Sequence, residues 1–141
     1  MSFPSPSEFY KQFRDAPEVA KRTAFGMGQK FGEALLQRCG IEGEGLEVVA
    51  ELLNEAMRTV RGEPSARVEG DRVILRNQGF CGVMRSALTL NVPWEWLDVN
   101  FAWPWLEGIV STIRPDIEIR IPSARCRGDE ACIHVFEVER G

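Results

Sequence analysis

The spacing of apolar side chains predicts the helices of this chain. From residue 46 onward, apolar positions recur every three or four residues, which is the period of a helix with one buried face. These positions are Leu46, Val49, Ala50, Leu53, Met57 and Val60. Shorter patterns predict a helix at about 7–13, with Ser7 as its N-cap, and a long one from Pro17 to Cys39, which Gly40 ends. A further helix is expected from Pro93, with Pro104 breaking or kinking it.

The long helix carries a stripe of small side chains four residues apart. The stripe consists of Ala20, Ala24, Gly28 and Gly32, and it ends at Leu36. Each glycine inside a helix costs about 1 kcal/mol relative to alanine, so the stripe is expected to have a compensating use. Two uses remain open: close packing of another helix or a second subunit, or space for a ligand against the backbone.

Alternation of apolar and polar residues predicts the strands. Residues 67–75 form a hairpin with its turn at Glu69-Gly70-Asp71, and residues 116–121 alternate between charged residues and isoleucine. The last strand is expected to begin at Cys132, which places Cys132, His134 and Phe136 on one face. Helices interleaved with paired strands indicate an α+β fold, mainly an antiparallel sheet packed against helices.

Composition limits the class of protein. A chain of 141 residues is the size of one domain, 1–141, with its own hydrophobic core. Its net charge of −4 argues against nucleic-acid binding, which needs a surplus of Lys and Arg. The N-terminus lacks the pattern of a signal peptide, and no apolar run approaches the ~20 residues of a membrane span. We therefore expect a cytoplasmic protein whose four cysteines are thiols or metal ligands rather than disulfides.

The tryptophans are concentrated in one segment. All four lie between Trp94 and Trp105, at spacings that no single helix face can hold. Core packing is one interpretation. The other is an aromatic wall around an apolar small molecule, since such pockets are lined by aromatic side chains with few polar groups. Glu107, one turn after Trp103, is the carboxylate expected to face such a pocket.

The C-terminal segment concentrates groups that bind metals or act as nucleophiles. Cys126 and Cys132 flank a Gly-Asp turn, and the only histidine, His134, follows two residues later. Thiolates and imidazole are the preferred ligands of zinc, and Cys81 would be the fourth. Alternatively, a cysteine next to His134 would be an activated nucleophile, with Cys81 or Cys126 better placed than Cys132. The motifs of the common enzyme classes are absent from the sequence.

The order of these elements resembles the 4-vinyl reductase domain family, small-molecule-binding domains that sense aromatic hydrocarbons in some transcription activators. The similarity covers residues 46–140 and leaves 1–40 as an additional N-terminal helical region. It rests on the helix from Leu46, the 67–75 hairpin, the segment 100–110, the 117–121 strand, and the closing motif of Cys126, Gly128, Asp129 and Cys132. The related aminothiazoline-carboxylate hydrolase-like proteins are similar too, and Cys81 stands about where they carry a cysteine.

The resemblance implies a fold like the haem nitric oxide/oxygen-binding superfamily, a buried apolar pocket and a homodimer. Zinc-holding members use a cysteine at the start of the last helix and a glutamate three residues before the first C-terminal cysteine. Here those places hold Val99 or Asn100, and Ser123. Only Cys126 and Cys132 therefore carry over as zinc ligands, with Cys81 and His134 as candidates to complete the site.

We accordingly expect the protein to bind or sense an apolar or aromatic small molecule in a pocket between helices and sheet. Its predicted lining is Phe80, Met84, Phe101, Trp103 and Trp105. The alternative is a hydrolase- or reductase-like enzyme on the same scaffold. Its catalytic candidates are Cys81, His134 and Glu107.

Overall fold

The computed structural model describes residues 5–77, 82–123 and 132–138, and within these ranges the fold is α+β, as predicted. The helices are α1 (Pro6–Phe13), α2 (Pro17–Cys39), α3 (Leu46–Thr59), α4 (Gly82–Thr89), α5 (Trp94–Leu97) and α6 (Trp103–Ser111), with a π-helical turn η1 (Asp98–Ala102) before α6. The strands are β1 (Pro64–Glu69), β2 (Arg72–Asn77), β3 (Ile117–Ser123) and β4 (Cys132–Val138).

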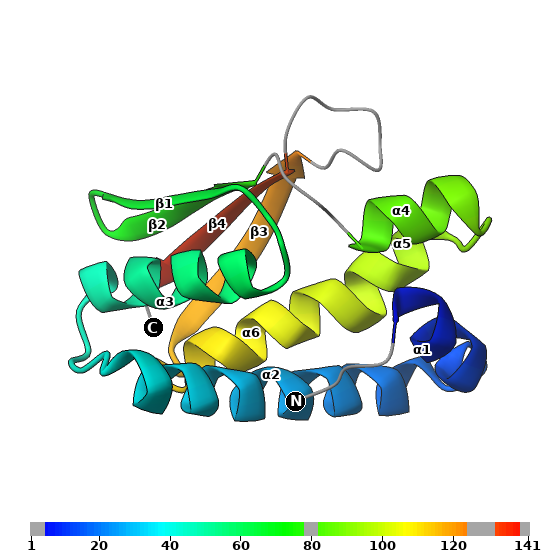
Figure 1. Cartoon of the computed structure of the whole chain (residues 1–141), viewed down its shortest axis with the longest axis horizontal. Coiled ribbons are helices and arrows are strands. Elements are labelled where there is room, and N and C mark those ends of the chain that lie inside the picture. Colours follow the sequence, from blue (N-terminus) through cyan, green and yellow to red (C-terminus); the bar gives the residue numbers. More distant parts are fainter. Residues whose placement is uncertain (1–4, 78–81, 124–131, 139–141) are drawn as a thin grey trace.

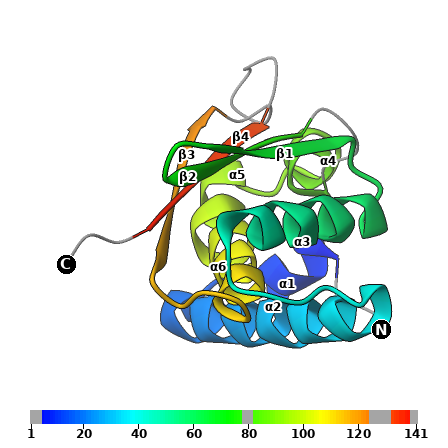
Figure 2. The same ribbon diagram turned by 90° about the vertical axis from the view of Figure 1, so that its left-hand side faces the viewer.

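The four strands form one sheet in the order β1-β2-β4-β3, and every neighbouring pair is antiparallel. β1 and β2 are the predicted hairpin, closed at Gly70 in the left-handed conformation that glycine favours. The helices pack on one face of the sheet: α3 and α6 lie between it and α2 (Figures 1 and 2). No described helix spans enough apolar residues to cross a membrane.

The main core lies between the sheet and these helices. It joins residues of α2, α3, α6 and the inner faces of β2 and β4: Phe31, Leu35, Leu52, Leu53, Val73, Leu75, Leu106, Ile109, Val110 and Phe136. The face of β4 that carries Cys132, His134 and Phe136 points toward the helices, as the alternation predicts, because Phe136 is fully buried in this core. A second cluster joins α1 to α2, where Phe9 contacts Phe13 and Phe101.

The small-residue stripe of α2 is a helix-packing surface against α6. A Cβ on Gly28 would overlap the backbone carbonyl of Trp105, and one on Gly108 of α6 would overlap the carbonyl of Phe25. At Gly32, a Cβ would lie 3.0 Å from the carbonyl oxygen of Ile109. The two backbones are therefore in direct contact, which is the packing interpretation of the stripe.

The segment around Pro104 is helical throughout but changes its winding. Proline has no N–H and its ring collides with the carbonyl four residues earlier, here that of Asn100. The π-helical turn Asp98–Ala102 precedes it, and Pro104 occupies the first turn of α6, where a missing N–H costs nothing. The predicted disruption is thus a local widening of the helix rather than a break.

Two details of the first helix differ from the prediction. α1 begins earlier than predicted, and its cap is Ser5 rather than Ser7, because the Ser5 hydroxyl accepts from the Glu8 amide at 3.2 Å.

The outer edge of β1 is covered by α3: the side-chain amide of Asn54 donates to the Ala66 carbonyl at 3.2 Å and accepts from the Ala66 amide at 2.8 Å. Asn54 thus takes the place of a neighbouring strand at this residue.

Replacing Gly28 or Gly108 with alanine should lower the free energy of unfolding by about 2 kcal/mol, because the added methyl group forces two backbones apart. Gly26→Ala is the matched control on the same helix, since nothing lies within 4 Å of its Cβ position. That control should raise stability by about 0.5–1 kcal/mol through helix propensity. Urea unfolding measures both effects, and equal changes at Gly26 and Gly28 would contradict the packing account.

Asn54→Ala should lower the free energy of unfolding by about 1 kcal/mol, because both hydrogen bonds to Ala66 are lost. Asn54→Asp keeps the acceptor for the Ala66 amide and should lose less. Equilibrium denaturation of the two variants measures the difference, and an unchanged Asn54→Ala protein would show that water replaces both bonds at no cost.

Candidate functional site

Two regions of the described structure combine polar groups with aromatic side chains. One is the end of the sheet's inner face, where the apolar core gives way to His134. The other is an open groove between α2 and the η1–α6 segment. Trp103 lines the groove, and its indole nitrogen is buried.

The inner face of the sheet becomes polar toward the start of β4. Along the β2–β4 register, Val73 pairs with Phe136, Leu75 with His134, and Asn77 with Cys132. Val73, Leu75 and Phe136 belong to the main core, whereas His134, Asn77 and Cys132 are buried beyond it. The Asn77 side chain has a structural use, because its oxygen accepts from the Glu63 amide at 2.9 Å.

His134 is a buried and neutral base. Only 9% of its surface is exposed, and burial lowers the pKa of the imidazole to about 4 because the charged form loses its hydration. Its Nδ1 atom is buried without a hydrogen-bond partner among the described residues. A neutral imidazole carries one donor and one acceptor nitrogen, so Nδ1 is able to serve in either role.

Trp103 carries the other buried nitrogen that lacks a partner in the described part of the chain, its indole Nε1. Helical spacing places Trp103 on the side of α6 that also carries Leu106 and Val110. Those two side chains pack in the core beneath the sheet. Helical spacing therefore places Trp103 on the side of α6 that faces the sheet, and the register of β4 places His134 on the side of the sheet that faces the helices.

The other predicted aromatic residues have different surroundings. Trp105 stacks on Phe31 of α2 at a ring-centroid distance of 5.5 Å, and Phe101 contacts Phe9 of α1 edge-on at 4.6 Å. These contacts join the helices to one another. Met84 lies on α4, and Phe80 lies outside the described residues. Among the described members of the predicted lining, Trp103 is the one with an unsatisfied polar atom.

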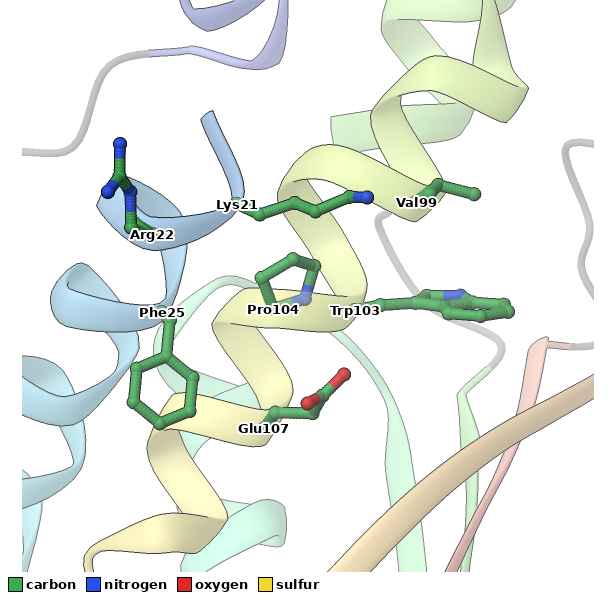
Figure 3. A pocket seen from close by; sticks show the side chains of 7 residues that line it. All are labelled: Lys21, Arg22, Phe25, Val99, Trp103, Pro104 and Glu107. Carbon is green, nitrogen blue, oxygen red and sulfur yellow. The ribbon is translucent and has the colours of Figure 1, made fainter. Parts of the chain in front are cut away.

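The open groove has a volume of about 480 Å³. One wall is formed by Val99, Trp103 and Glu107, which lie four residues apart along η1 and α6, with Pro104 beside them. The other wall is formed by Lys21, Arg22 and Phe25 of α2. Figure 3 shows Lys21 extending over Pro104 toward Val99, whereas Arg22 points away from Pro104. The carboxylate of Glu107 and the indole of Trp103 extend from α6 to the same side (Figure 3).

Glu107 therefore lines a pocket, and this pocket is an open groove whose other wall is α2. Partial burial raises the pKa of its carboxyl above the usual value. The wall formed by α2 is not predicted from the sequence, because the spacing of small residues on that helix says nothing about its other faces. The i, i+4 pair of Lys21 and Phe25, beside the stripe, was the available signal.

The catalytic and metal predictions concern residues that the described structure brings together only in part. Cys132 and His134 share the inner face of β4, but residues two apart on a strand are separated by about 7 Å of backbone. Glu107 lies on α6 in the groove. Cys81 and Cys126 lie outside the described residues, and so does the Gly-Asp turn.

Zinc requires four ligands in a structural site. Of the four candidates, the described ranges contain Cys132 and His134, and within those ranges no three His, Cys, Asp or Glu side chains gather as a metal site would require. The described residues by themselves do not fit a zinc ion. The zinc prediction stays a prediction that depends on Cys81 and Cys126.

Comparison with known proteins adds no assignment: no family model matches the chain, and no curated protein matches it significantly. The resemblance to 4-vinyl reductase domains and the superfamily that it implies therefore remain predictions.

The unfolding free energy should fall by about 3 kcal/mol as the pH decreases from 6.5 to about 4, through His134 alone. In that window the unfolded chain binds a proton on this imidazole and the folded chain does not; above it, His134 is neutral in both states and contributes nothing. Urea unfolding of the wild type and His134→Phe across this range isolates the contribution, because the carboxylates titrate equally in both. Parallel pH profiles would mean that the folded imidazole accepts a proton.

Proposed function

We propose that the protein binds a small apolar molecule that carries one hydrogen-bonding group, in the space between α6 and the polar end of the sheet's inner face. The observation that supports this is the pair of buried nitrogen atoms, Trp103 Nε1 and His134 Nδ1, that have no hydrogen-bond partner among the described residues. A buried polar atom without a partner costs about 1–3 kcal/mol, and native proteins rarely leave one.

The chemistry of the two nitrogens limits the ligand. Indole is only a donor, so Trp103 requires an acceptor, while the neutral imidazole offers Nδ1 as acceptor or donor. A hydroxyl group matches both roles chemically, because its oxygen can accept from an indole N–H and its proton can be donated to a neutral imidazole. Apolar side chains near the two nitrogens favour an aromatic or aliphatic body: Leu75 lies opposite His134 in the sheet, and Leu106 follows Trp103 on α6.

Binding is favoured over catalysis by the state of the imidazole. An activated cysteine needs a base that accepts its proton near neutral pH, and burial has lowered the pKa of His134 to about 4. Such an imidazole is a poor proton acceptor but a good neutral hydrogen-bonding group. The enzyme alternative would need a cysteine, Cys81 or Cys126, with His134 or Glu107 as its base, and both of those cysteines lie outside the described residues.

The test compares 1-naphthol with naphthalene, two probes of nearly equal shape that differ in one hydroxyl group, by calorimetric titration of the full chain. We expect 1-naphthol to bind about two- to tenfold more tightly, which is the range of one net hydrogen bond. Trp103→Phe and His134→Phe should each reduce that preference and leave naphthalene binding nearly unchanged.

Trp96→Phe is the matched control, because Trp96 packs against Tyr10 and Phe9 at the α1 end of the molecule. It should leave the preference for 1-naphthol intact. Equal affinity of the wild type for both probes, or no binding of either, would refute the proposed site.

A further inference from the structure

The groove between α2 and α6 carries charges of opposite sign on its two walls. It carries cationic side chains on one wall, Lys21 and Arg22, and a single carboxylate on the other, Glu107. No ion pair within the described residues joins the two walls, since Lys21 pairs with Glu18 on its own helix at 3.3 Å. The groove thus presents opposite charges across an unfilled space.

The other residues that line the groove are apolar. Phe25, Val99, Pro104 and the indole of Trp103 line it. Val99 is among the large apolar side chains that remain exposed, with 42% of its surface accessible. A volume of about 480 Å³ lies within the usual size of small-molecule sites.

We propose that this groove binds a small zwitterion with an apolar or aromatic body, whose ammonium group pairs with Glu107 and whose carboxylate pairs with Lys21. The two charges of such a ligand match the two walls, and its body covers Val99 and the accessible face of Trp103. Neither a simple anion nor a simple cation satisfies both walls. The indole face adds attraction for the ammonium group.

The state of Glu107 supports this assignment. Neighbouring atoms partly desolvate its carboxylate, which raises its pKa, and no cation of the described residues lies within ion-pair distance to offset that cost. A bound ammonium group would supply the missing charge. Lys21 is able to exchange partners because its pair with Glu18 is exposed on both sides.

The experiment uses three probes that share one ring and differ in charge: phenylalanine, phenethylamine and 3-phenylpropionate. They are titrated into the full-length, ¹⁵N-labelled chain, and binding is followed by the shifts of backbone amides and of the Trp103 indole N–H. Phenylalanine should bind several-fold more tightly than either singly charged probe and should shift the resonances of Lys21, Phe25 and Glu107.

Two substitutions separate the charges. Glu107→Gln should weaken phenylalanine and phenethylamine by about threefold, the range of an exposed ion pair, and leave 3-phenylpropionate unchanged. Lys21→Gln should weaken phenylalanine and 3-phenylpropionate and leave phenethylamine unchanged. Glu33→Gln, the same change at an exposed position of α2 that does not line the groove, should alter no affinity.

The groove proposal fails if the three probes bind equally, if none binds, or if Glu107→Gln and Glu33→Gln behave alike. His134→Phe distinguishes it from the proposed interior site. That variant should lose the preference for 1-naphthol while phenylalanine binding stays intact, so each proposal can fail without the other.

Discussion

The direct contact between the backbones of α2 and α6 determines the geometry of the rest of the molecule. Gly28 and Gly108 each face a carbonyl of the other helix, and neither position has room for a Cβ atom. Such close approach fixes both the separation of the helices and their rotation, because a small turn of either would bring a side chain into the contact. The contact also places Trp105 against Phe31, where the two rings stack. The glycines therefore determine where the side chains next to them on α2 and α6 lie.

Both proposed sites depend on this contact. With Gly108 against α2, helical geometry turns Leu106 and Val110 toward the sheet, and Trp103 lies on the same side one turn earlier. The same arrangement places Lys21 and Phe25 across from Trp103 and Glu107, which creates the groove. The helix pair is thus a rigid scaffold, and the residues available for function are those at the edges of its interface.

Elements with a strong period were predictable from the sequence, and their relative orientation was not. The helix from Leu46, the hairpin and the β4 alternation follow from local spacing, and the structure confirms them. The small-residue stripe indicated close packing but left its partner open, because only the folded chain specifies what approaches Gly28. The spacing does not distinguish Trp103 from Trp105, yet Trp105 stacks on Phe31 of α2, whereas the indole nitrogen of Trp103 has no hydrogen-bond partner among the described residues. The two residues differ because positions two apart on a helix lie on different faces of it.

The polar side chains inside the fold differ in whether they stabilise it. The part-buried side chain of Asn54 and the buried side chain of Asn77 satisfy backbone groups of the fold, so their hydrogen bonds stabilise the folded chain. His134 differs: burial opposes its protonation, and its Nδ1 atom contacts no described hydrogen-bond partner. A leucine at this position would suit the neighbouring core better on energetic grounds, as Leu75 does on the adjacent strand.

Trp103 would connect the two proposed ligands energetically. Its indole nitrogen is buried and the residue also lines the groove. A ligand that holds the indole in one orientation would therefore change the surface that the second ligand contacts. Ordering the Trp103 side chain has an entropic cost, which lowers the affinity of the ligand that binds first. The second ligand would then bind to a ring that is already ordered. Any resulting coupling must be reciprocal, because linkage requires each ligand to change the affinity of the other by the same factor. The close contact of α2 with α6 at Gly28 and Gly108 leaves no space for further approach of the two backbones, so we expect such coupling to act through the side chain.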